Sequence, residues 1–96
     1  MLRIASLIIL AATPAMAMDK AALCENSSQV VNAVVQERAG GATKKKAVRR
    51  VSKSLEGDLV IFRDAVAPLA DWVYDLPQEH LAEEAAAAYK ATCLEN

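Results

Sequence analysis

Two cysteines limit what this chain can fold into more than any other feature. The 96 residues contain only Cys24 and Cys93, which lie near the two ends of a region whose apolar residues recur at helical spacing. A bond between them would close a loop of about 70 residues, which the chain-entropy model credits with roughly 4 kcal/mol of stabilisation. That gain is comparable with the whole stability expected of a small domain. Whether the bond forms depends on the compartment in which the chain folds.

The amino terminus has the pattern of a cleaved export signal. A positive charge at Arg3 precedes an apolar run from Ile4 to Ala12, and small residues follow up to Ala17. The run is about half as long as a hydrocarbon core requires, so we do not expect a membrane anchor, and no later segment could cross a membrane. The sequence predicts a signal peptide over residues 1–17, cleaved after Ala17, and a single helical domain over residues 18–96. The expected location is the periplasm or the exterior.

Export determines how the cysteines are interpreted. In an oxidising compartment, two cysteines in a small chain favour one structural disulfide, here Cys24–Cys93. A redox or metal-binding thiol would need CxxC spacing or histidine partners, and the single histidine, His80, is distant from both. We therefore expect the disulfide, with no metal and no cofactor.

The spacing of apolar residues predicts an all-α bundle of four helices, possibly five, whose first and last helices are joined by the disulfide. The first helix should run from about residue 20 to Ala39 and end at Gly40-Gly41. Thr43 is suited to cap the second helix, and Asp58 to cap the third. The inward residues expected in the second helix are Ala47, Val48, Val51 and Leu55.

The third segment carries most of the large apolar residues. Pro68 lies inside its helical pattern and should kink the helix or split it in two. Asp75 to Gln78 should end this segment and start the last helix, with Pro77 in the first turn and capping-box spacing between Asp75 and Gln78. The inward residues expected in the third segment are Leu59, Phe62, Val66, Leu69 and Val73, and those expected in the last helix are Leu81, Ala85, Ala88, Tyr89, Thr92 and Cys93.

A run of basic residues is the strongest candidate for a binding site. Residues 44–53 carry six positive charges and no acid, whereas the whole chain has a net charge of −1. Such polarity favours binding to something acidic: an acidic envelope protein or an anionic membrane surface. Nucleic acid is not expected, because the chain is exported and no aromatic residue interleaves the lysines. The interpretation that the sequence favours over binding, because charge runs are usually surface, is a solvated helix face paired with the chain's own carboxylates. The candidate residues are Lys44, Lys45, Lys46, Arg49, Arg50 and Lys53.

Other chemistry-bearing residues are sparse. Glu79, Glu83 and Glu84 surround His80 at helical spacing, which could supply two metal ligands but not a third, so a charged first turn of a helix is the favoured interpretation. The serines lie on expected helices without a nucleophile turn, and the chain is too short for a two-domain cleft. The sequence does not predict an enzyme. An expected aromatic cluster of Trp72, Tyr74 and Tyr89 belongs to the core or, alternatively, to a partner-binding patch.

These features resemble two kinds of protein. The order Cys24, Arg38-Ala39-Gly40, Val73-Tyr74-x-x-Pro77 and Cys93-Leu94 is similar to that in small exported, two-cysteine, all-helical proteobacterial proteins of uncharacterised function. More distantly, the architecture of residues 18–96 resembles the periplasmic acid-stress chaperones of the HdeA type, and this resemblance assigns no functional residue.

We therefore predict an exported, non-enzymatic helical protein that acts by binding another macromolecule, for example as an inhibitor or immunity-like protein for an envelope enzyme. The alternative is an HdeA-like chaperone that exposes apolar surface in acid.

Overall fold

The computed structural model describes residues 19–80 and 83–96, and their regular structure is entirely helical. The predicted signal peptide and the inward position predicted for Leu81 lie outside these residues. The expectation of an all-α bundle of four helices is confirmed. Two short 3-10 segments, η4 and η5, accompany the α-helices. The elements are α1 (Lys20–Ala39), α2 (Lys44–Ser54), η4 (Gly57–Ala65), α3 (Val66–Asp75), η5 (Gln78–His80) and α4 (Glu83–Glu95).

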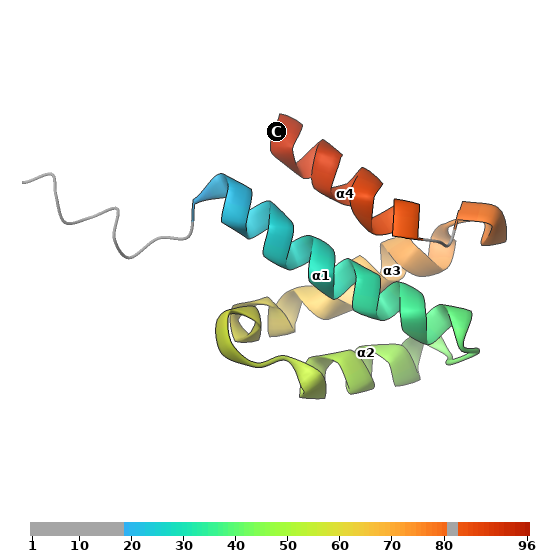
Figure 1. Cartoon of the computed structure of the whole chain (residues 1–96). Helices are drawn as coiled ribbons and strands as arrows, with labels where there is room; N and C mark the ends of the chain where they lie inside the picture. Colours follow the sequence, from blue (N-terminus) through green and yellow to red (C-terminus); the bar gives the residue numbers. More distant parts are fainter. Residues whose placement is uncertain (1–18, 81–82) are drawn as a thin grey trace, which may run out of the picture.

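Helix α1 is the centre of the bundle. It packs against α2, α3 and η4 on one side and against α4 on the other (Figure 1). This position explains why its buried residues are not confined to a single narrow stripe. Ser27 and Ser28 are buried with them, and each hydroxyl donates to a carbonyl of its own helix, Leu23 O at 2.8 Å and Glu25 O at 2.7 Å.

The core consists mainly of valine and alanine side chains. Val30, Val31 and Val34 of α1 are fully buried, and they pack with residues of α2, η4 and α3. The predicted inward faces are confirmed for most positions in these elements. Those fully or largely buried are Ala47, Val51, Leu55, Phe62, Val66 and Val73, and those half-buried are Val48, Leu59 and Leu69.

The first loop is fixed by the capping residues that the sequence indicates. Gly41 adopts φ +94°, which allows Ala42 N–H to donate to Glu37 O at 3.0 Å across the end of α1. The Thr43 hydroxyl then accepts a hydrogen bond from Lys46 N–H at 3.2 Å and caps α2, as predicted.

The third segment divides, but not where Pro68 was expected to divide it. The 3-10 segment η4 ends at Ala65, and α3 begins at Val66, so Pro68 stands in the first turn of α3. Backbone donors in a first turn have no intrahelical partner, so proline's missing N–H costs nothing there. The cap predicted at Asp58 is wrong: η4 follows Glu56, which makes no side-chain capping bond, and Asp58 lies inside the segment.

The last helix also begins later than predicted. Gln78–His80 form the separate turn η5, and α4 starts at Glu83. Within the described residues, the Asp75 side chain makes no capping bond to Gln78. The predicted inward stripe of α4 holds at Ala85 and Tyr89 and is wrong at Ala88 and Thr92, which are exposed. The reason is that α4 packs mainly on α1 and leaves the side that faces α3 open.

No helix in the described part of the chain combines the length and apolarity needed to cross a membrane.

Candidate functional site

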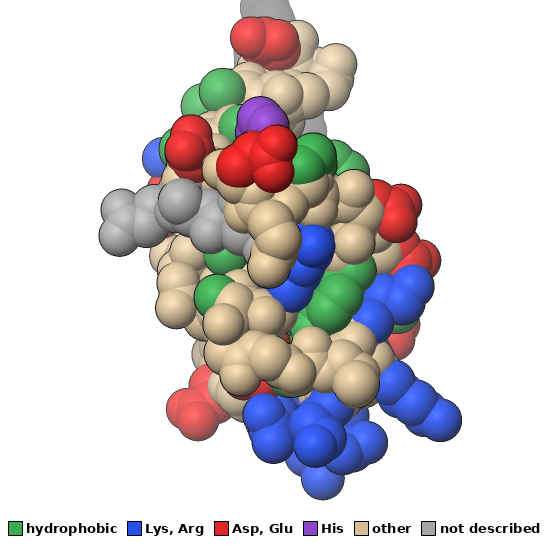
Figure 2. Space-filling view, turned by 90° about the vertical axis from the view of Figure 1, so that its right-hand side faces the viewer, with side chains coloured by type: hydrophobic (Ala, Val, Ile, Leu, Met, Phe, Trp, Pro, Cys, Tyr) green, Lys and Arg blue, Asp and Glu red, His purple; other side chains and the backbone are tan. Residues whose placement is uncertain are grey.

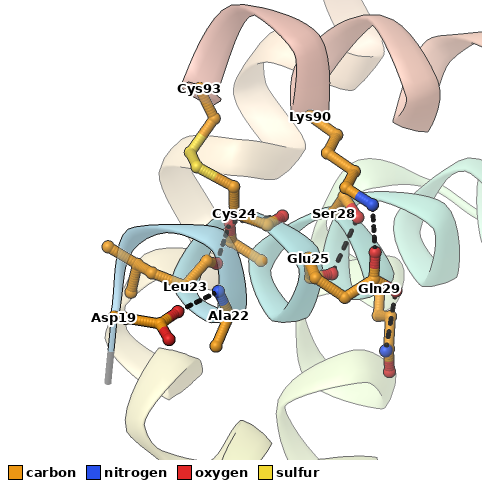
Figure 3. A network of polar contacts seen from close by, with 10 residues as sticks. Asp19, Ala22, Leu23, Cys24, Glu25, Ser28, Gln29, Lys90 and Cys93 are labelled. Atoms are coloured by element: carbon orange, nitrogen blue, oxygen red, sulfur yellow. Dashed lines mark hydrogen bonds and ion pairs between the residues drawn. A yellow bond between two sulfur atoms is a disulfide. The ribbon is translucent and has the colours of Figure 1, made fainter. Parts of the chain in front are cut away.

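The disulfide joins α1 to α4 as predicted. Cys24 is fully buried, its Sγ is 1.99 Å from that of Cys93, and the two Cα atoms are 5.7 Å apart (Figure 3). About one turn away, Lys90 Nζ donates to Glu25 Oε1 at 2.6 Å. This hydrogen bond, a second one from Gln29 and the positive charge of Lys90 lower the pKa of the Glu25 carboxyl. One covalent bond and one ion pair therefore reinforce the packing between the two helices.

The six basic residues of the predicted binding face all lie on α2, and all are exposed. Figure 2 shows Lys and Arg side chains gathered at the lower end of the molecule, where α2 lies in Figure 1. Helix α2 is strongly amphipathic because its other face, with Ala47 and Val51, is buried in the core.

Two of the six charges are paired within the protein. Lys44 Nζ is 2.8 Å from Asp71 Oδ1 of α3, and this hydrogen bond and charge raise the pKa of Lys44. Arg50 Nη1 is 3.0 Å from Glu37 Oε1 of α1. These contacts connect the two edges of α2 to its neighbours. For Lys44 and Arg50, the prediction that the basic residues pair with the chain's own carboxylates is confirmed.

The other four cations, Lys45, Lys46, Arg49 and Lys53, form what we call the basic stripe. In the part of the chain that the structure describes, none of them has an ion pair or side-chain hydrogen bond. Lys45, Arg49 and Lys53 follow one another at successive turns, over about 12 Å of helix, opposite the buried face. Like charges at this spacing repel each other, and nothing in the described bundle offsets that repulsion.

Among the described residues, Arg38 makes the most extensive polar contact between helices, a role that was not predicted from the sequence. Its Nη1 donates to Val73 O at 2.6 Å and to Leu76 O at 2.8 Å, two carbonyls at the end of α3, of which Val73 O also accepts from Leu76 N–H. Its guanidinium lies 5.5 Å from the centre of the Tyr74 ring, and the Tyr74 hydroxyl donates to Ala42 O at 2.6 Å. Burial raises the pKa of Tyr74. Two segments that the sequence analysis singled out, Arg38-Ala39-Gly40 and Val73-Tyr74-x-x-Pro77, therefore contact each other.

The predicted aromatic cluster separates into two parts. Tyr74 belongs to the Arg38 contact, whereas Trp72 and Tyr89 form a tilted pair with ring centroids 6.1 Å apart. That pair forms part of the wall of an open groove of about 520 Å³ between α3 and α4, which we call the aromatic groove. Its lining residues are Leu69, Trp72, Ala88, Tyr89, Thr92, Cys93 and Asn96.

The residues predicted around His80 lie on two separate elements of the described structure. His80 and Glu79 are exposed in η5, while Glu84 belongs to α4. Within residues 19–80 and 83–96, no three His, Cys, Asp or Glu residues are placed to hold a metal ion.

Comparison with protein families, curated proteins and solved structures finds no match to this chain. The candidate sites are therefore defined by their own geometry. Two surfaces stand out, the basic stripe on the outside of α2 and the aromatic groove between α3 and α4.

Proposed function

We propose that this is an exported, non-enzymatic protein that acts by binding an acidic macromolecule through the basic stripe. One observation carries the proposal: four exposed cations share the outer face of one helix and have no partner among the described residues. The paired residues Lys44 and Arg50 support the proposal. Carboxylates of this protein neutralise these two charges on the flanks of α2, and the basic stripe between them has no ion pair among the described residues.

The stripe is held rigidly, which favours binding. Thr43 caps α2, its apolar face is buried at Ala47 and Val51, and ion pairs connect it to α1 and α3. A partner therefore meets a helix backbone whose position is already fixed, so less backbone conformational entropy is lost on association. The partner we favour is an acidic envelope protein, such as an enzyme that this protein would inhibit or neutralise. An anionic membrane surface is the rival partner.

Charge reversal on the stripe tests the proposal. The variant with Lys45→Glu, Arg49→Glu and Lys53→Glu should lose its partner in a pull-down from periplasmic extract, while its helical circular dichroism stays unchanged. Binding by the unmodified protein should also weaken as salt rises. Vesicles containing phosphatidylglycerol distinguish the two rival partners, because the unmodified protein should bind them if its partner is an anionic membrane surface.

A matched pair of single variants controls for net charge. Arg49→Glu and Lys20→Glu make the same change at exposed positions, one on the stripe and one at the start of α1. Only Arg49→Glu should weaken capture of the partner. Equal binding by the triple variant and the unmodified protein, at low and high salt, would mean that the stripe is only a solvated surface.

The acid-stress chaperone is the second candidate, and the distribution of ion pairs favours it. Each of the three pairs among the described residues crosses between helices: Lys90–Glu25, Arg50–Glu37 and Lys44–Asp71. Ion pairs of this kind need an ionised carboxylate and are lost in strong acid, although each of these three is exposed and individually weak. A chaperone should loosen reversibly in acid and then suppress aggregation of an unfolded client. A bundle that stays compact at pH 3 would exclude this role.

A further inference from the structure

The aromatic groove is a second surface, independent of the basic stripe. Its volume of about 520 Å³ lies in the range of ligand-binding pockets, and its walls are mostly apolar. Trp72 is 37% exposed, and it stands with Leu69 and Tyr89 in one continuous apolar surface. A partly exposed tryptophan in a groove is the kind of residue that anchors protein–protein interfaces.

The groove exists because of how α4 is attached. The disulfide, the Lys90–Glu25 pair and the small side chains of Ala85 and Ala86 hold α4 against α1. Among the described residues, α4 meets α3 mainly through the Trp72–Tyr89 ring pair, and the space beside that pair stays open, with Cys93 in its wall.

The surroundings of the groove are acidic. Trp72 and Ala88 also line a smaller adjoining hollow of about 190 Å³, whose other lining residues include His80 and Glu84. Residues 66–96 contain six acidic side chains, of which Asp71 is paired with Lys44 of α2, and one basic side chain, Lys90, which is paired with Glu25 of α1. Figure 2 shows acidic side chains beside the single histidine, at the end of the molecule opposite the basic cluster.

We propose that the aromatic groove binds a cationic amphipathic helix of a partner protein. The apolar face of that helix would lie against Leu69, Trp72 and Tyr89, and its basic residues would face Glu84 and the acidic end of the groove. Charge complementarity selects this occupant over an acidic one. A second copy of the chain does not fit the description, because the apolar face of its own basic helix α2 is buried in the core.

Trp72 provides a direct reporter, since it is the only tryptophan in the chain. The probe is a synthetic 14-residue peptide of leucine and lysine, patterned as an amphipathic helix and labelled with fluorescein. We expect saturable binding by fluorescence anisotropy and, with the unlabelled peptide, a blue shift of Trp72 emission. A peptide of the same composition in scrambled order and a leucine–glutamate analogue should bind at least tenfold more weakly.

A matched pair of variants locates the binding. Ala88→Arg fills the groove and neutralises its acidic end, whereas Ala87→Arg makes the same change at an exposed position that does not line the groove. The first should weaken peptide binding at least tenfold and the second less than twofold. Thr92→Arg, also in the groove wall, replaces Ala88→Arg if that variant loses its helical spectrum.

The stripe variant separates this proposal from the proposed function. With Lys45, Arg49 and Lys53 changed to glutamate, the protein should still bind the leucine–lysine peptide with unchanged or greater affinity. Equal binding of the scrambled peptide, or unchanged binding by the groove variants, would overturn the proposal. A concentration-dependent dimer in sedimentation that Ala88→Arg abolishes would instead assign the groove to a second copy of the chain.

Discussion

Helices α1 and α4 are bound into this protein in different ways. Helix α1 has four valines at 1% exposure or less, and each buried valine contributes about 1.5–3 kcal/mol of hydrophobic stabilisation. Among the described side chains of α4, only that of Ala85 is buried, and the large Leu94 is 44% exposed. Alanine burial contributes much less because so little apolar area is involved. Packing thus fixes α1, whereas α4 buries less apolar area and depends more on its bonds to α1.

The same contrast separates the two candidate binding surfaces. The basic stripe lies on a helix whose opposite face belongs to the main core, so its geometry is as stable as the bundle. The aromatic groove depends on the position of α4, and hence on the Cys24–Cys93 bond. A change that frees α4 should therefore abolish the groove and leave the stripe intact.

The largest expected effect comes from removing the disulfide. The double variant Cys24→Ala and Cys93→Ala should lose about 2–5 kcal/mol of unfolding free energy. Urea denaturation followed by circular dichroism measures that loss. Hydrogen exchange should show that the amides of α4 lose protection before those of α1, α2 and α3. Uniform loss of protection across all four helices would contradict the contrast between α1 and α4.

A smaller effect is expected at Arg38, inside the unit formed by α1, α2 and α3. Arg38→Met keeps an apolar stem but removes the guanidinium that donates to the carbonyls of Val73 and Leu76, and of these two only Val73 O keeps a backbone donor, Leu76 N–H. Loss of these charge-assisted hydrogen bonds should cost about 1–3 kcal/mol of unfolding free energy, measured in urea. Arg49→Met, at an exposed arginine without a partner among the described residues, should change it by less than about 0.5 kcal/mol. Equal effects of the two substitutions would show that the Arg38 contact contributes nothing to stability.

These contacts also mark the limit of sequence interpretation. The helices, the glycine end of α1, the Thr43 cap and the disulfide could be predicted, since each follows from periodicity, local backbone chemistry or the count of cysteines. The role of Arg38 could not, because its acceptors lie 35 and 38 residues away. The predicted break at Pro68 was wrong because a proline in the first turn of a helix and one in a helix interior look alike in sequence. The actual break lies between Ala65 and Val66.

The candidate sites divide in the same way. The exposure of the six basic residues follows from helical spacing against a buried apolar face. The division of that run into paired flanks and a free stripe depends on Glu37 and Asp71, which are contributed by two other helices. The aromatic groove was not foreseen, because it results from which helix α4 packs against, and the alanines of α4 do not specify that choice.

The smallest expected effect concerns the ion pair between Lys90 and Glu25, the second bond that holds α4. Lys90 and Gln29 lower the pKa of Glu25 below its ordinary value of 4.5, so the carboxylate favours the folded state above that pH. This contribution disappears as the pH falls through the lowered pKa. Glu25→Gln should therefore speed hydrogen exchange in α4 at pH 7, and the difference from the unmodified protein should vanish in acid.

Glu37→Gln is the matched control for Glu25→Gln. It makes the same substitution in the same helix, but its partner Arg50 lies on α2 rather than α4. Because packing fixes α2 against α1, Glu37→Gln should leave exchange in α4 unchanged at either pH, and high salt should shrink the effect of Glu25→Gln. If both variants loosen α4 equally, the ion pair acts through the whole bundle. Helix α4 would then be held by packing as firmly as the rest.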